Sequence, residues 1–130
     1  MTAETRQEPT RILIVDDDPD VNEFLVWVFV SNDYQVANAH NGQEALDLLA
    51  RDNFDVILLD LVMPGTGGMA VIEELREHGV PLPIVVLSGH VGCLDAGRIR
   101  RLGVSEVLCK PAKAGQVLIA VEKALRAAVS

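Results

Sequence analysis

The sequence predicts a single α/β domain built on a parallel β-sheet, and three observations support this class. Short apolar segments alternate along the chain with segments of helical periodicity, the order expected when helices connect parallel strands. The segment Val56–Leu59 is apolar at every position, as in a strand buried on both faces of a sheet. Finally, 130 residues with 49% apolar content suffice for one hydrophobic core.

Five strands and five helices are expected in alternation, in one domain over residues 11–128 after a disordered lead at 1–10. Proline suits the first position of a helix, so Asp18 is expected to cap a helix that begins at Pro19. The predicted strands are Arg11–Val15, Tyr34–Ala39, Asp55–Leu59, Leu82–Leu87 and Val104–Cys109. The predicted helices cover 19–31, Gly42–Arg51, the segment from the Gly65–Gly68 loop to about His78, 94–102 and 113–128.

Composition excludes several classes of protein. Eleven basic and nineteen acidic residues leave a net charge of −8, which disfavours binding to a nucleic-acid backbone. No segment approaches the roughly 18 apolar residues of a membrane span, and the polar start Met1–Arg11 does not resemble a signal peptide. Cys93 and Cys109 match no metal or disulfide spacing, so we expect reduced thiols in a cytoplasmic protein.

Polar residues follow four of the predicted strands. Because the carboxyl ends of parallel strands meet at one edge of the sheet, these side chains are expected to converge where open α/β sheets bind ligands. Clustered carboxylates raise one another's pKa values unless a cation relieves them. Oxygen ligands without histidine or cysteine favour Mg²⁺. The residues concerned are Asp16, Asp17, Asp60, Ser88 and Lys110.

This set of residues indicates phosphoryl transfer. A lysine charge and a hydroxyl donor can stabilise phosphoryl oxygens, and a carboxylate can itself be the nucleophile that forms an acyl phosphate. We therefore expect Mg²⁺-assisted phosphorylation of Asp60. Two simpler interpretations are that Asp60 only turns the chain after a strand, and that the run Asp16–Asp18 only caps a helix.

The sequence resembles the receiver domains of two-component response regulators over about residues 10–128. The resemblance rests on several short motifs that occur in the order and at the spacing of that family. They are Val15-Asp16-Asp17, Leu59-Asp60 with Met63-Pro64 and Gly68, Leu87-Ser88-Gly89, and Lys110-Pro111.

The resemblance implies a flavodoxin-like, doubly wound five-stranded parallel sheet of order 2-1-3-4-5 with five helices. It implies that Asp60 is the phosphoacceptor and that Asp16, Asp17 and the Val62 carbonyl complete the protein's Mg²⁺ ligands. It also implies that Ser88 and Lys110 contact the phosphoryl oxygens. Lys110–Pro111 is then expected to be a cis peptide.

Two positions depart from the family. Val107 stands where an aromatic ring often changes rotamer on phosphorylation, so that way of reading out the phosphoryl group is not expected here. Ala112 replaces the common aromatic residue after the Lys-Pro pair, which leaves that corner less bulky.

Three functions compete on this sequence. The preferred one is a phosphorelay receiver that takes a phosphoryl group from the phosphohistidine of a histidine kinase or a histidine phosphotransfer protein. Such a domain is not an enzyme beyond its own phosphorylation and dephosphorylation. An aspartate-nucleophile phosphatase would require an acid two residues after Asp60, where Val62 stands. The alternative is a pseudo-receiver that acts as a protein-binding scaffold, which would be expected to lack some of the acidic residues or the lysine.

The first predicted helix carries more apolar residues than packing on a sheet requires. Val21, Phe24, Leu25 and Val28 have the spacing of one inward stripe. The remaining apolar residues are expected to lie outward and to dock the histidine protein beside the Asp60 crevice. They are Val26, Trp27 and Val30.

Overall fold

Five parallel strands form one sheet in the order β2-β1-β3-β4-β5, as predicted. In the computed structural model, which describes residues 8–89 and 96–128, five helices alternate with these strands. The strands are β1 (Arg11–Val15), β2 (Gln35–Ala39), β3 (Val56–Leu59), β4 (Ile84–Ser88) and β5 (Glu106–Cys109). The helices are α1 (Pro19–Val30), α2 (Gly42–Arg51), α3 (Gly68–Glu77), α4 (Ala96–Arg101) and α5 (Ala114–Ala128).

Four strands begin later than the sequence indicates, β2 and β3 by one residue and β4 and β5 by two. β4 begins at Ile84 rather than at Leu82, since Pro83 has no N–H to donate to a neighbouring strand. β5 begins at Glu106 because the Val104 N–H donates instead to the Ile99 carbonyl at the end of α4. The first residues of the predicted lead (1–7), Cys93 and the first two residues of the predicted helix at 94–102 lie outside the described residues.

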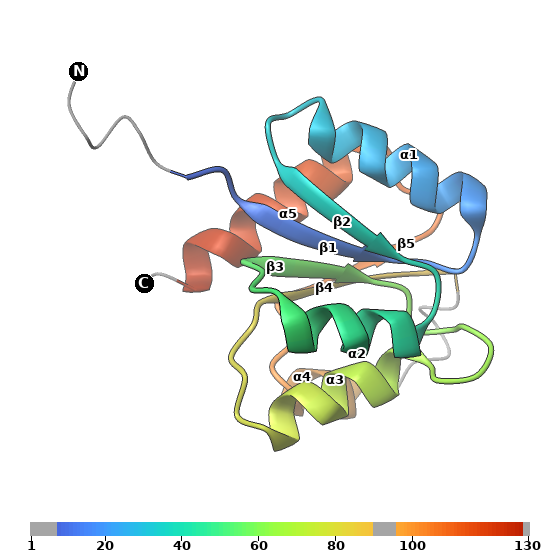
Figure 1. Cartoon of the computed structure of the whole chain (residues 1–130), viewed down its shortest axis with the longest axis vertical. Coiled ribbons are helices and arrows are strands. Elements are labelled where there is room, and N and C mark those ends of the chain that lie inside the picture. The colour runs from blue at the N-terminus through green and yellow to red at the C-terminus, as the bar shows by residue number, and fades with distance from the viewer. Residues whose placement is uncertain (1–7, 90–95, 129–130) are drawn as a thin grey trace.

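The sheet lies between two helical layers (Figure 1), with α1 and α5 on one face and α2, α3 and α4 on the other. Alternate residues of β3 belong to the two separate cores. Ile57 and Leu59 join the core under α2 and α3, whereas Val56 and Leu58 join the core under α1 and α5. All four are at most 1% exposed, which confirms a central strand buried on both faces.

The strands that carry the predicted acidic residues end level with one another. Val15 is paired with Ala39 of β2 and with Leu59 of β3. The Asp60 N–H then donates to the Val15 carbonyl at 2.9 Å. Asp16 and Asp60 therefore leave the sheet side by side at its carboxyl edge.

Helix α1 begins as the sequence predicts. The Asp18 carboxylate accepts hydrogen bonds from the backbone N–H groups of Asp20 at 2.9 Å and Val21 at 3.4 Å, and Pro19 is the first helical residue. An N-cap of this kind satisfies N–H groups that have no partner within the helix. Asp18 is thus used locally and points its carboxylate at the helix start.

The rotation of α1 about its axis differs from the prediction. Trp27 and Val30 are 64% and 56% exposed, as expected, but Phe24 is 40% exposed instead of facing the sheet. Val26, predicted to face outward, is half-buried against the core under α1 and α5. Because α1 is apolar almost all round, its sequence contains no polar side that would indicate the outward direction.

The buried side of α1 is defined by Asn22, Leu25, Val28 and Phe29. Phe29 is fully buried and packs edge-on against Tyr34, with ring centroids 4.9 Å apart and ring planes at 82°. Such aromatic pairs stabilise a fold by more than the burial of their surface area alone. The requirement to bury Phe29 next to Leu25 turns Phe24 toward solvent.

Among the described residues, no helix combines the length and the apolar character needed to cross a membrane.

The two aromatic residues of α1 provide a matched test of this packing. Phe29→Ala should lower the free energy of unfolding by about 3–5 kcal/mol, because it opens a cavity in a closed core. Trp27→Ala removes a largely exposed ring and should change it by about 0.5 kcal/mol or less. Urea unfolding followed by circular dichroism measures both. Equal losses in the two variants would contradict the described rotation of α1.

Candidate functional site

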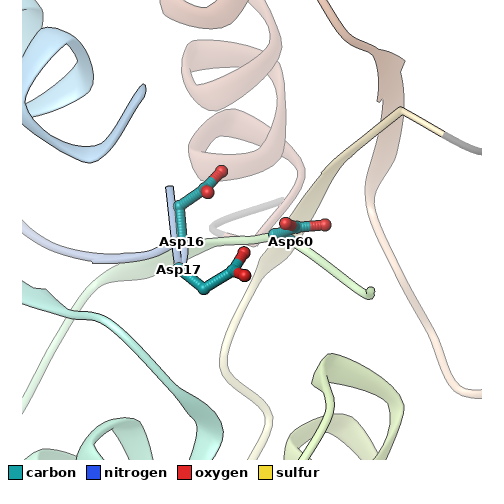
Figure 2. Close-up of side chains that lie close together, drawn as sticks. All are labelled: Asp16, Asp17 and Asp60. Carbon is teal, nitrogen blue, oxygen red and sulfur yellow. The ribbon is translucent and has the colours of Figure 1, made fainter. Parts of the chain in front are cut away.

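Three carboxylates meet at the carboxyl edge of the sheet, as the sequence predicts. Carboxylate oxygens of Asp16, Asp17 and Asp60 lie within 4.8 Å of one another. Figure 2 shows that Asp16 and Asp17 come from the end of one strand and Asp60 from the end of another, with the three side chains projecting to the same side. Asp16 and Asp60 are 1% and 4% exposed, whereas Asp17 is exposed.

The loop after β3 holds the Asp60 carboxylate. The Val62 N–H donates to Asp60 Oδ1 at 3.1 Å. Helix α3 then begins at Gly68, so close to the strand end that a Cβ there would lie 2.3 Å from the Asp60 carbonyl oxygen. A side chain at Gly68 would therefore push the helix away from the site.

The same loop is attached to the start of α2. The Gly42 N–H donates to the Thr66 carbonyl at 3.2 Å, and a Cβ on Gly42 would meet that oxygen at 2.3 Å. Glycine at this position allows the two backbones to touch. The Asp60 loop is thus held at Gly42 and at Gly68.

Lys110 lies between the two buried carboxylates. Its Nζ is 2.8 Å from Asp16 Oδ2 and 3.1 Å from Asp60 Oδ2. Its backbone N–H donates to the Ser88 carbonyl at 3.0 Å, which joins the ends of β5 and β4. The Lys110–Pro111 peptide is cis, which confirms the prediction.

For both Asp60 and Lys110, burial shifts the pKa in one direction and the oppositely charged partner shifts it in the other. Burial raises the pKa of the Asp60 carboxyl above its ordinary value and Asp16 adds to this, although the Val62 N–H and Lys110 oppose the shift. Burial alone would lower the pKa of Lys110, but its hydrogen bonds and ion pairs with Asp16 and Asp60 raise it. The lysine therefore remains charged.

The cluster has the charge and the donor atoms that suit a divalent cation. Asp16 Oδ1 accepts from the Asp18 N–H at 2.9 Å. Asp16 Oδ2 is buried, and its one polar interaction among the described residues is the ion pair with Lys110. Three carboxylates face one ammonium group, which leaves an excess of negative charge. Carboxylate oxygens with open positions for water or phosphate are typical of Mg²⁺ sites.

Ser88 and Val62 both lie at the carboxyl edge of the sheet, and their roles toward phosphoryl oxygens and metal stay predictions. Ser88 is fully buried at the end of β4, which lies beside β3 in the sheet. The Val62 backbone lies at the site through its bond to Asp60, while its side chain is 50% exposed.

Sequence reasoning missed Asn22. This residue is 1% exposed, and its side chain is hydrogen-bonded to the Asp16 carbonyl. The signal was its spacing, three residues before Leu25 and seven before Phe29, which places it on the buried side of α1. A polar residue on that side of a helix requires partners in the core.

A mostly apolar groove adjoins the site. It has a volume of about 350 Å³ and lies between the start of α1 and the turn after β5. Phe24 of α1 lines it opposite Ala112, and Lys110 is part of its wall. The small side chain of Ala112 keeps this corner open, as the sequence indicates.

A five-stranded sheet of this order, with carboxylates and a lysine at its carboxyl edge, defines a receiver domain of the kind found in response regulators. Residues 12–122 match the family described as "Response regulator receiver domain", and the chain belongs to this family.

The chain is similar to several individual members. It is 46% identical over 95 residues to the response regulator MprA of Mycolicibacterium vanbaalenii, an alignment that covers 68% of this chain and 41% of the relative. The chain thus spans about two fifths of the length of this curated relative. A CheY-like receiver domain protein from Methanospirillum hungatei has the same fold, with a TM-score of 0.88 at 20% identity over 94% of this chain and 98% of the other.

The response regulator protein TrrA from Thermotoga maritima is also similar, at 29% identity and a TM-score of 0.79. The match covers 89% of this chain and 99% of TrrA. That structure was solved in complex with Mg(2+)-BeF.

The raised pKa of Asp60 predicts that this carboxylate destabilises the metal-free protein. A carboxyl pKa that is higher in the folded than in the unfolded chain lowers stability above the folded pKa, and the penalty disappears as pH falls toward the unfolded value. Asp60→Asn should therefore raise the free energy of unfolding at pH 7 in the presence of a chelator. The difference from wild type should narrow as the pH is lowered.

Urea unfolding at several pH values measures this effect. Asp52→Asn is the control, because Asp52 lies exposed at the end of α2 and its replacement should change stability by about 0.5 kcal/mol or less. A less stable Asp60→Asn protein at pH 7 would show that the ion pair with Lys110 outweighs the burial of the carboxylate.

Proposed function

We propose that this domain receives a phosphoryl group on Asp60 from the phosphohistidine of a histidine kinase or histidine phosphotransfer protein. The observation that carries the proposal is the placement of Asp60. Its buried carboxylate lies 3.1 Å from the Lys110 ammonium and within 4.8 Å of the carboxylates of Asp16 and Asp17. This is a nucleophile beside one fixed positive charge and a set of metal-binding oxygens.

The transfer is a displacement at phosphorus. An Asp60 carboxylate oxygen forms a bond to phosphorus while the bond between phosphorus and the donor imidazole nitrogen breaks, and the electron pair of that bond remains on the imidazole. The product is an acyl phosphate on Asp60. Lys110 neutralises a phosphoryl oxygen, and the Ser88 hydroxyl donates a hydrogen bond to another.

Asp16, Asp17, Asp60 and the Val62 carbonyl are the proposed Mg²⁺ ligands. When bound, the ion neutralises the charge that accumulates on the phosphoryl oxygens. The buried Asp16 Oδ2, whose one polar interaction among the described residues is the ion pair with Lys110, supports the assignment. The Mg(2+)-BeF complex of the similar TrrA is consistent with it.

The domain, proposed to span residues 11–128 with a disordered lead at 1–10, acts on itself and not on a separate substrate. Its chemistry consists of its own phosphorylation and dephosphorylation, since Val62 occupies the position where an aspartate-nucleophile phosphatase would carry its acid. A cytoplasmic location fits the proposed donors.

The proposed docking surface consists of the exposed apolar residues of α1, corrected for the rotation of that helix. It comprises Phe24, Trp27 and Val30, whereas the half-buried Val26 is not part of it. The groove between Phe24 and Ala112 continues this surface to Lys110 at the phosphorylation site. A helix that carries the donor histidine could contact both at once.

The chemistry is tested with a small phosphodonor. Wild-type protein incubated with Mg²⁺ and acetyl phosphate should gain one acid-stable, base-labile phosphoryl group, measured by intact mass. Asp60→Asn should gain none, because an amide cannot act as the nucleophile. Full labelling of Asp60→Asn would refute Asp60 as the acceptor.

The docking surface is tested by comparing two phosphodonors. Trp27→Ala should slow phosphotransfer from the phosphohistidine protein, since truncation of an aromatic anchor costs about 2 kcal/mol or more of binding free energy. Labelling by acetyl phosphate should remain close to wild type. Ile119→Ala on α5 removes another exposed apolar side chain, 56% exposed against 64% for Trp27, and should affect neither reaction. Equal loss with both donors would assign Trp27 to the fold, and no loss with either would exclude it from docking.

A further inference from the structure

We propose that Asn22 is a positioning residue for the metal-binding carboxylates, acting on Asp17 through the peptide that joins Asp16 to Asp17. The proposal rests on the function proposed above, in which Asp17 binds Mg²⁺. Packing of α1 on the sheet does not require a polar side chain, and the proposal gives the buried Asn22 a role.

The side-chain amide of Asn22 is fully engaged. Its Nδ2 donates to the Asp16 carbonyl at 3.0 Å and to the Ala39 carbonyl at 2.9 Å. Its Oδ1 accepts from Asn38 Nδ2 at 2.6 Å. An amide with both N–H groups and its oxygen bonded in the core is held in a single orientation.

These bonds lie where the chain leaves the sheet. The last pair between β1 and β2 is Val15 with Ala39, and the Asp16 N–H donates to the same Ala39 carbonyl at 3.2 Å. Asn22 therefore holds together the ends of two strands just past their last pair. The direction of the Asp16 carbonyl, and with it the plane of the peptide that leads into Asp17, depends on this amide.

Asp17 needs this support more than its neighbours do. The Asp16 carboxylate is held by the Asp18 N–H and Lys110, and the Asp60 carboxylate by the Val62 N–H and Lys110. Asp17 is exposed, and within residues 8–89 and 96–128 its carboxylate has no hydrogen bond or ion pair. Its approach to the other two carboxylates is therefore set by the backbone that carries it.

Replacement of the amide would release that backbone. Leucine is close to asparagine in size but donates no hydrogen bond, so Asn22→Leu leaves the carbonyls of Asp16 and Ala39 without the bonds that the amide donates. The planar peptide can then rotate, and the Asp17 carboxylate moves with it. Loss of a group that orients a metal ligand typically lowers metal affinity by about 10- to 100-fold.

The experiment measures Mg²⁺ affinity directly, by calorimetry on the folded protein. Asn22→Leu should bind Mg²⁺ about 10- to 100-fold more weakly than wild type. Acetyl phosphate labelling should require correspondingly more Mg²⁺, yet approach the wild-type rate at saturation, because Asp60 and Lys110 are unchanged. A purely structural role would instead lower the folded fraction without changing the affinity of the molecules that remain folded.

Asn32→Leu is the matched control. Asn32 follows the C-terminal end of α1, and its side chain also donates to a backbone carbonyl, that of Val28, at 2.7 Å. Its replacement should leave Mg²⁺ affinity at the wild-type value. A similar loss of affinity in both variants would overturn the proposal.

Two further variants keep the test decisive if Asn22→Leu does not fold. Asn38→Val removes the donor to Asn22 Oδ1 from an edge strand that tolerates valine, and should weaken Mg²⁺ binding in the same direction but less. In an Asp17→Asn background, Asn38→Val or Asn22→Leu should cause no further loss, since the effect passes through Asp17.

Additive losses, or an affinity of Asn22→Leu within about two-fold of wild type, would overturn the role of Asn22 and leave the proposed function intact. Failure of the wild-type protein to bind Mg²⁺ would overturn both.

Discussion

The ion pairs of Lys110 organise the functional edge of this domain. One ammonium group lies 2.8 Å from Asp16 Oδ2 and 3.1 Å from Asp60 Oδ2, and both of those carboxylates are almost completely buried. Without a nearby positive charge, burial of two ionised carboxylates would cost a large amount of folding free energy. Within the described residues, no other basic side chain forms an ion pair with them. The turn after β5 and the ends of β1 and β3 are thereby held at one point.

The single positive charge of Lys110 does not neutralise the three carboxylates, and the remaining negative charge suits the site to a divalent cation. Three carboxylates face the lysine, and the raised pKa of Asp60 shows that burial and the charge of Asp16 outweigh the favourable contacts. A divalent cation relieves the same repulsion and offers coordination positions to phosphate oxygens. The buried carboxylates therefore lower the stability of the fold while they supply the oxygens that a cation can bind, as is common for charged groups at functional sites.

The surroundings of the site differ from the usual family pattern at two corners. Ala112 leaves the groove beside Phe24 open, and Val107 is 41% exposed on β5 with no ring that could change rotamer. The chain spans about two fifths of the length of the curated relative MprA. Phe24 of α1 and Lys110 of the acidic cluster line that same groove.

The sequence by itself determined the fold class, the strand order implied by the family motifs, the acidic cluster, the lysine and the cis peptide. The fold class, the acidic cluster and the lysine follow from short-range signals, because an apolar run that ends in a polar residue already indicates a buried strand with its functional end. The strand order and the cis peptide were implied by the resemblance to the family. Only the tertiary structure decided the rotation of α1, which exposes Phe24, half-buries Val26 and places Asn22 in the core. A helix that is apolar nearly all round has several similar inward stripes. Burial of Phe29 against Tyr34 and the hydrogen bonds of Asn22 to two backbone carbonyls select one of these stripes. All of these partners lie outside α1, so no pattern within the helix identifies them.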